Sequence, residues 1–201
     1  MRASITRAQV LSRSAKGGAA LLVGGSALGA LVAEAAAEPL PTADLDTARL
    51  LVGIELLASD FYSRAIKAAK TDRRVTSFVK RASANERDHY RALSVILTRA
   101  GVTPAGPDDF DFTYADGTFA SKRAIVKFAE MLEATTLGAY LTALGTTENS
   151  ALRAPMALIA ACEAQHSAYF TTAAGGKPFG RSFPRALPID QVAKMLNLDV
   201  G

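Results

Sequence analysis

Four side chains in the first half of the sequence recur in the second half at a nearly constant spacing of 77 or 78 residues. The recurring pairs are Glu55 and Glu133, Glu86 and Glu163, His89 and His166, and Tyr62 and Tyr140. The chain has only two histidines, and each follows a glutamate by three residues. Such a repeat predicts two structural units of the same layout, related by a pseudo-two-fold axis.

Apolar residues in both units recur at steps of three and four, which predicts amphipathic helices rather than strands. Leu50, Ile54, Leu57 and Phe61 show this spacing in the first stretch. Turn and helix-stop residues separate the stretches, and Asp72 is suited to cap the second one. The predicted helices span about residues 43–70, 72–100, 121–144 and 150–174, and a short helix is expected near 189–196.

The connections determine the topology that we expect. Short breaks near 71–72 and 146–149 predict two antiparallel hairpins, whereas the segment 101–120 contains prolines and glycines that exclude a continuous helix. A helix of this length measures roughly 40 Å. An extended segment of that size reaches up to roughly 66 Å, so it can return along the whole bundle. The predicted fold is therefore an all-α four-helix bundle over residues 41–174, with one long crossover between helices two and three.

The hairpins place the repeated glutamates level with one another. Glu55 and Glu86 lie at equal distances from the first turn, and Glu133 and Glu163 lie at equal distances from the second. Glutamate and histidine three residues apart share a helix face. Each hairpin thus brings a lone glutamate beside a Glu-x-x-His pair, and together the hairpins offer four carboxylates and two imidazoles.

This donor set suits iron or manganese ions, two of which fit a duplicated site. The predicted ligands are Glu55, Glu86, His89, Glu133, Glu163 and His166. Without a metal, four buried carboxylates would repel one another and would be costly to desolvate. The alternative is a solvated surface, because polar neighbours flank Glu86 and His89. Tyr62 and Tyr140 lie nearly two turns after the lone glutamates, and either act next to the ligands or are simply core aromatics.

These motifs resemble the ligand pattern of ferritins, rubrerythrins and bacterioferritins. The chain resembles more closely an exported ferritin-like domain family that includes desiccation-related proteins, through its Ile-Glu followed by Phe-Tyr, its Phe-Asp-Phe crossover and its proline-rich tail. The resemblance covers residues 43–198. It implies a ferritin-like four-helix bundle with two metal ions, and it implies that Glu86 and Glu163 bridge them.

Three functions follow from this interpretation. The first is a di-iron oxidoreductase that reacts with oxygen or peroxide, in iron oxidation or in protection against oxidative or desiccation stress. The second is a non-catalytic metal-binding or stress-protective bundle, and the third is a manganese catalase-like activity. Whether the chain is an enzyme is left open by the sequence. The proline- and glycine-containing tail, 175–201, differs from the short fifth helix of cage-forming storage ferritins.

The N-terminal segment predicts export. Four basic residues precede an apolar run that ends in Ala-Glu-Ala-Ala-Ala, the three-part pattern of a secretory signal within residues 1–37. The destination would be the periplasm, cell envelope or extracellular space. An uncleaved anchor, organellar import and a disordered segment are the alternatives. We expect no stable membrane span after signal removal.

Charge gives no indication of a nucleic-acid partner. The chain carries a net charge of +4, but removing the first 37 residues leaves 19 basic and 18 acidic residues. The single cysteine, Cys162, excludes an internal disulfide and is expected to be a small packing residue. A homodimer is compatible with the sequence but is not required by it.

Overall fold

The computed structural model describes residues 40–178, 180 and 182–196. The expected export segment, residues 1–37, lies outside this range. The described part is all-helical and contains no strand, as predicted. Its elements are α3 (Thr42–Ala68), α4 (Arg73–Arg99), the 3-10 turn η1 (Pro107–Asp109), α5 (Lys122–Thr146), α6 (Ser150–Ala173) and α7 (Ile189–Leu196).

The helix ends follow from local chemistry. The Asp72 carboxylate accepts a hydrogen bond from the backbone N–H of Val75, and so caps the start of α4. Beyond α4, Gly101 adopts a φ of 77°, which a glycine takes without steric strain. Ser121 caps α5 and Asn149 caps α6 in the same way as Asp72. The Asp72 and Asn149 caps lie at the two tight turns that the sequence predicts, whereas the Ser121 cap ends the crossover.

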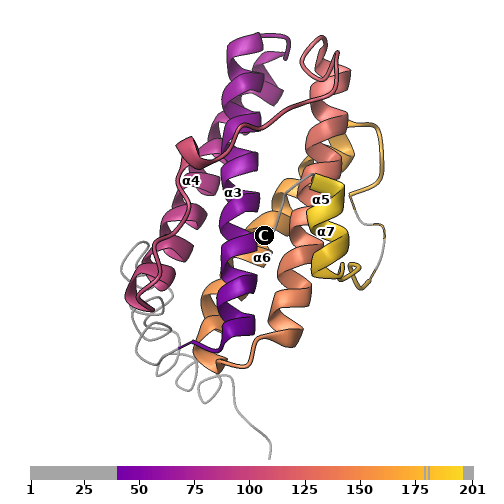
Figure 1. Cartoon of the computed structure of the whole chain (residues 1–201). Helices are drawn as coiled ribbons and strands as arrows, with labels where there is room; N and C mark the ends of the chain where they lie inside the picture. The colour runs from indigo at the N-terminus through magenta and orange to yellow at the C-terminus, as the bar shows by residue number, and fades with distance from the viewer. Residues whose placement is uncertain (1–39, 179, 181, 197–201) are drawn as a thin grey trace, which may run out of the picture.

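Two polar contacts fix the relative directions of the hairpins. At one end of the bundle, buried Asp44 near the start of α3 accepts hydrogen bonds from the backbone N–H groups of Glu148 and Asn149, at 3.0 and 2.8 Å. At the other end, Lys122 at the start of α5 pairs with Asp72 at the α3–α4 turn, at 2.5 Å. The crossover therefore begins at the Asp44 end and must run the length of the bundle, as Figure 1 shows.

Aromatic side chains hold the crossover against α3. Tyr114 donates a hydrogen bond to the Asp60 carboxylate at 2.9 Å, and its ring lies 6.1 Å from that of Phe61. Phe119 packs on the same Phe61 ring, with the centroids 5.5 Å apart. Asp60 is thus an anchor for the crossover.

The C-terminal tail covers α5. The backbone of Leu187 donates a hydrogen bond to the carbonyl of Gly138 at 3.0 Å, and the Thr142 hydroxyl donates to the Leu187 carbonyl at 2.6 Å. A β-carbon at Gly138 would lie 2.6 Å from the Leu187 side chain, so the close approach requires glycine. The tail then leads into α7, which packs on α5 (Figure 1). No helix of the described residues combines the length and hydropathy that a bilayer crossing requires.

Candidate metal centre

Charged side chains from all four bundle helices meet in the interior. α3 supplies Glu55 and α5 supplies Glu133, whereas α4 and α6 each supply a Glu-x-x-His pair. The four glutamates are at most 1% exposed, and the histidines are 7% and 2% exposed. The structure thus brings together all six residues that the repeat singled out, and the surface alternative is wrong. Their role as metal ligands stays a prediction.

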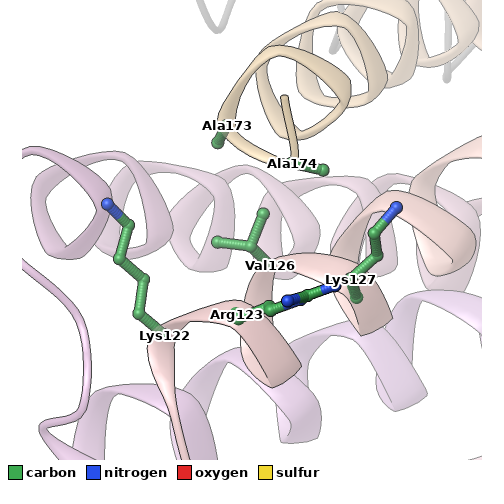
Figure 2. Close-up of a pocket in the computed structure, with 6 residues that line it drawn as sticks. All are labelled: Lys122, Arg123, Val126, Lys127, Ala173 and Ala174. Carbon is green, nitrogen blue, oxygen red and sulfur yellow. The ribbon is translucent and has the colours of Figure 1, made fainter. Parts of the chain in front are cut away.

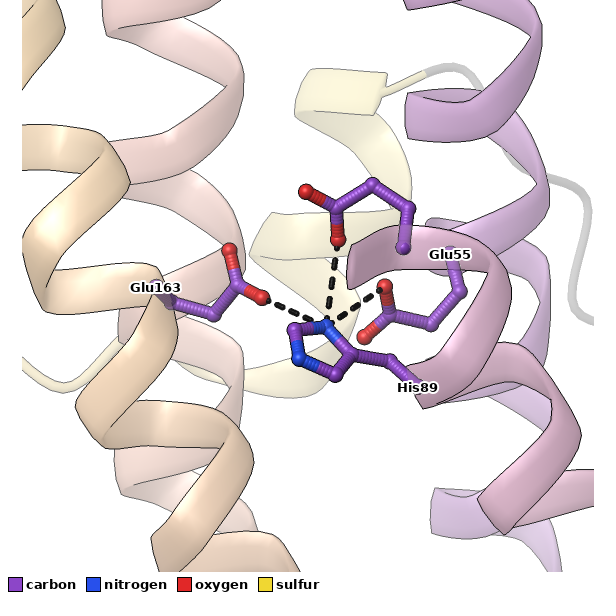
Figure 3. Close-up of side chains that lie close together, drawn as sticks. Glu55, His89 and Glu163 are labelled. Carbon is purple, nitrogen blue, oxygen red and sulfur yellow. Dashed lines mark hydrogen bonds and ion pairs between the residues drawn. The ribbon is translucent and has the colours of Figure 1, made fainter. Parts of the chain in front are cut away.

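One group of donors surrounds His89. Its Nδ1 atom lies 2.9 Å from Glu163, 3.2 Å from Glu86 and 3.6 Å from Glu55, measured to a carboxylate oxygen in each case. Figure 3 shows Glu55 and Glu163 reaching this nitrogen from helices on opposite sides. A histidine nitrogen and three carboxylates therefore converge on one small volume.

The second group repeats this arrangement around His166. Its Nδ1 atom lies 3.0 Å from Glu86, 3.5 Å from Glu163 and 3.6 Å from Glu133. Glu86 and Glu163 belong to both groups, whereas Glu55 and Glu133 each belong to one. The centroids of the two imidazole rings are 6.5 Å apart. The site consists of two halves that share two carboxylates, which is the layout of a two-metal centre.

The spacing of the donors fits metal ions. Ligands at right angles around an ion, each about 2.1 Å from it, lie about 3 Å from one another. The distances from each Nδ1 to its carboxylate oxygens run from 2.9 to 3.6 Å, at this value and somewhat above it. Several buried donor atoms also lack a hydrogen bond within the described residues, including Oε2 of Glu55, both oxygens of Glu163 and Nδ1 of His166. Buried polar atoms normally have partners, so these atoms indicate a place for cations.

Burial and neighbouring charges determine which side chains of the metal-free site hold protons. Burial, reinforced by the Glu163 charge, raises the pKa of Glu133 to about 8. Burial also raises the pKa of Glu55 well above its usual range. Burial alone would lower the histidine pKa values, but contacts with the Cys162 sulfur and the surrounding carboxylates outweigh it and raise the pKa of His89 and that of His166. In the metal-free site, protons on these groups thus supply the positive charge that metal ions would bring, because burial disfavours carboxylate charge that nothing compensates.

The two tyrosines connect the hairpins. The Tyr62 hydroxyl on α3 donates a hydrogen bond to Glu133 on α5, and the Tyr140 hydroxyl on α5 donates to Glu55 on α3. Each tyrosine therefore contacts the lone glutamate of the other hairpin rather than the one on its own helix. Both rings are fully buried. The contacts orient the two unshared carboxylates, so the tyrosines are more than core aromatics.

Two residues next to the histidines were missed by the sequence argument. The Asn85 side-chain nitrogen lies 3.0 Å from Nε2 of His166, on the ring edge opposite Nδ1, and 3.4 Å from the Cys162 sulfur. The Cys162 sulfur lies 3.6 Å from the same Nε2 atom. Burial opposes ionisation of this thiol, but its contacts with His166 and His89 lower its pKa overall.

The repeat contained the signal for these two residues. Asn85 and Cys162 are 77 residues apart, and each immediately precedes a Glu-x-x-His pair. They therefore occupy equivalent positions in the two units, and the pseudo-two-fold axis brings them together. Glu130, one turn before Glu133, is not part of the site: it pairs with Lys127 at 2.9 Å, and the corresponding residue in the first unit is Val52.

Comparison with known families agrees with this architecture. The ferritin-like domain family matches residues 43–176, which is most of the chain and includes all six charged residues of the centre. Comparison with curated proteins finds no match.

Proposed function

Because the chain belongs to the ferritin-like domain family, we propose that it holds two metal ions, iron in the working protein, and reacts with oxygen or peroxide. The observation that carries the proposal is the pair of donor groups that share Glu86 and Glu163. A pair of ferrous ions would supply two electrons to the oxidant, in iron oxidation or in protection against oxidative or desiccation stress.

The donor set supports a reactive centre rather than a structural one. Each half offers one imidazole and three carboxylates, two of them shared, so two ions have few protein donors apiece. Structural metal sites are usually closed by protein ligands, whereas reactive sites keep a position open. Four ionised carboxylates carry four negative charges, which two divalent ions balance. This match favours a pair of ferrous or manganous ions over a single monovalent ion.

Residues of the chain would prepare the site for this chemistry. Tyr62 and Tyr140 hold the unshared carboxylates by hydrogen bonds, so these ligands need little reorganisation. Burial of all four glutamates keeps bulk water away from the donors. The protons held at Glu133 and Glu55 would leave when metal enters, since both carboxylates must be ionised to bind it.

The test combines loading with rapid kinetics. Metal-free protein is loaded anaerobically with two equivalents of ferrous iron, and then mixed with oxygen or with hydrogen peroxide in a stopped-flow instrument. Fast oxidation that is saturable in oxidant supports the proposal. If neither oxidant reacts faster than with free ferrous ion, the oxidoreductase proposal fails and a non-catalytic metal-binding bundle takes its place. The same experiment with manganese tests for catalase-like release of oxygen from peroxide.

The place of action that we propose is outside the cytoplasm. The support is the basic stretch, apolar run and alanine-rich end within residues 1–37. N-terminal sequencing of protein from its native source checks this proposal. We expect a mature chain that begins near residue 38, and a cytoplasmic protein that retains Met1 would refute export.

A further inference from the structure

Three arginines lie on the surface close to one side of the metal centre. Arg73, Arg74 and Arg81 are exposed on α4, and together with Ser77, Phe78 and Tyr169 they line a hollow between α4 and α6. We call this surface the arginine face. None of its arginines pairs with an acidic residue in the described part of the chain. The face therefore has an uncompensated positive charge on a domain that is otherwise nearly neutral.

A second basic hollow differs in this respect. It lies between the start of α5 and the end of α6, and it is lined by Lys122, Arg123 and Lys127 (Figure 2). Lys122 is paired with Asp72 and Lys127 with Glu130. Two of its three charges are already paired with carboxylates of the chain, so this second hollow offers little to an anionic partner.

Aromatic rings connect the arginine face to the metal centre. Tyr169 and Phe78 stack face to face, with centroids 3.5 Å apart and planes inclined by 5°. Phe78 then meets the His166 ring edge-on, at 5.9 Å and 84°. A branch runs from Phe78 to Phe170, with centroids 5.3 Å apart, and on to Tyr62, whose hydroxyl donates to Glu133. The Tyr169 hydroxyl donates to the backbone carbonyl of Arg74, which fixes the outer ring beneath the arginines.

We propose that the arginine face docks a small acidic electron-carrier protein, and that Tyr169 and Phe78 form the path by which its electrons reach the metal centre. The inference rests on the proposed function, because it requires ions that have been oxidised. In each encounter the carrier would give up one electron and an oxidised ion held by the centre would gain it, with no bond made or broken. Two such encounters would return two oxidised ions to the ferrous state.

Burial explains why a path is needed. The ligands are almost inaccessible, so a protein partner cannot touch them and must deliver electrons from the surface. The arginines provide the charge complementarity that steers an acidic partner to the outer end of the path. A nucleic acid fits this surface less well. Single-stranded nucleic acids bind by stacking their bases on free aromatic faces, whereas Phe78 and Tyr169 stack on each other.

The docking part is tested with full-length protein and flavodoxin, a small acidic flavoprotein, as the probe. Binding is followed by titration at low and at physiological salt. The double variant Arg74→Gln/Arg81→Gln should raise the dissociation constant about tenfold and flatten its salt dependence. The matched control, Arg91→Gln/Arg99→Gln, removes two charges from the other end of α4 and should bind like the wild type. Equal binding by both variants would overturn the docking surface, as would a preference of the face for a single-stranded oligonucleotide.

The path is tested by pre-steady-state reduction. Iron-loaded protein is oxidised with peroxide and then mixed with saturating reduced flavodoxin, and the re-reduction rate is measured. Phe78→Leu should slow this step, whereas Phe78→Tyr, which keeps an aromatic ring, should restore it. Iron content and helical circular dichroism of each variant are measured in parallel, so that a loss of folding or loading is recognised. The path would be overturned if Phe78→Leu protein of normal iron content were re-reduced at the wild-type rate.

Failure of the proposed function gives a different result. If the iron-loaded wild type reacts with neither oxygen nor peroxide, the reaction proposed for the centre is wrong, and the electron path is overturned with it. If it reacts but flavodoxin, at concentrations below saturation, re-reduces it no faster than it re-reduces the Arg74→Gln/Arg81→Gln variant, the function stands and the present inference is wrong.

Discussion

The two halves of the centre have the same ligands but different surroundings. Glu55 with His89, and Glu133 with His166, occupy matching positions, share the same two carboxylates and receive matching tyrosine hydrogen bonds. The aromatic path reaches only the His166 half. The positions that correspond to Phe78 and Tyr169 in the repeat are Pro155 and Ala92. The two halves thus share the ligands that would hold metal ions, but they differ in their connection to the surface.

The shared carboxylates should give the largest effect, because each serves both halves. Glu86→Ala or Glu163→Ala should lower ferrous binding to one ion per chain or fewer. Paired oxidation should fall by more than the roughly 100-fold that loss of an outer-sphere partner can cause. Helical circular dichroism should persist, because removing one carboxylate also relieves repulsion. Glu130→Ala, which removes a carboxylate outside the centre, is the control. Two tightly bound ions in Glu86→Ala protein would show that Glu86 is not shared.

Metal removal should make stability depend on pH. The pKa of Glu133 is about 8 in the metal-free fold, against an ordinary value of 4.5. The folded state therefore holds more protons than the unfolded state between these values, and stability falls as the pH rises through that window. The loss should be roughly a few kcal/mol by pH 8. In the loaded protein the ions replace the protons, so the decline should disappear.

Thermal unfolding at pH 5 and pH 8, with and without metal, measures this effect. Glu133→Gln cannot ionise and should flatten the decline in the metal-free protein, whereas Glu130→Gln should leave it unchanged. A metal-free protein that is more stable at pH 8 than at pH 5 would contradict the charge argument for the centre.

Asn85 should distinguish the halves. Its side chain contacts Nε2 of His166, and the ring edge opposite a coordinating nitrogen orients the ring and tunes its basicity. Asn85→Ala should lower the binding affinity for one of the two ions about tenfold and leave the affinity for the other nearly unchanged. A ferrous titration by calorimetry resolves the two steps. An equal loss of affinity for both ions would mean that the two halves do not bind metal independently.

Replacement of the tyrosines should have the smallest effect, and the two replacements should lower stability by nearly the same amount. Tyr62→Phe and Tyr140→Phe each remove one hydrogen bond to an unshared carboxylate, at a cost of about 1 kcal/mol in stability. Chemical denaturation of both variants measures the two costs under the same conditions. A difference of several kcal/mol between them would show that the pseudo-two-fold symmetry does not extend to these contacts.

Much of this architecture could be predicted from the sequence, for definite reasons. The 3.6-residue periodicity, the caps and the repeat spacing are local or one-dimensional features, and they were sufficient for four helices, the long crossover and the convergence of the six charged residues. The cross-hairpin contacts of Tyr62 and Tyr140 could not be predicted, because helical phase gives a face but not a partner. The Phe78–Tyr169 stack joins residues from different hairpins without a counterpart in the repeat, so no pattern indicated it.

The central claim is that each chain forms one two-metal centre, and the metal stoichiometry tests it most directly. Metal-free protein is titrated anaerobically with ferrous iron, and the bound metal is counted by elemental analysis after gel filtration. We expect two ions per chain in the wild type, with a loss of binding when His89 and His166 are replaced together by alanine. Retention of fewer than one ion per chain by the wild type, or of two ions by the double variant, would contradict the account.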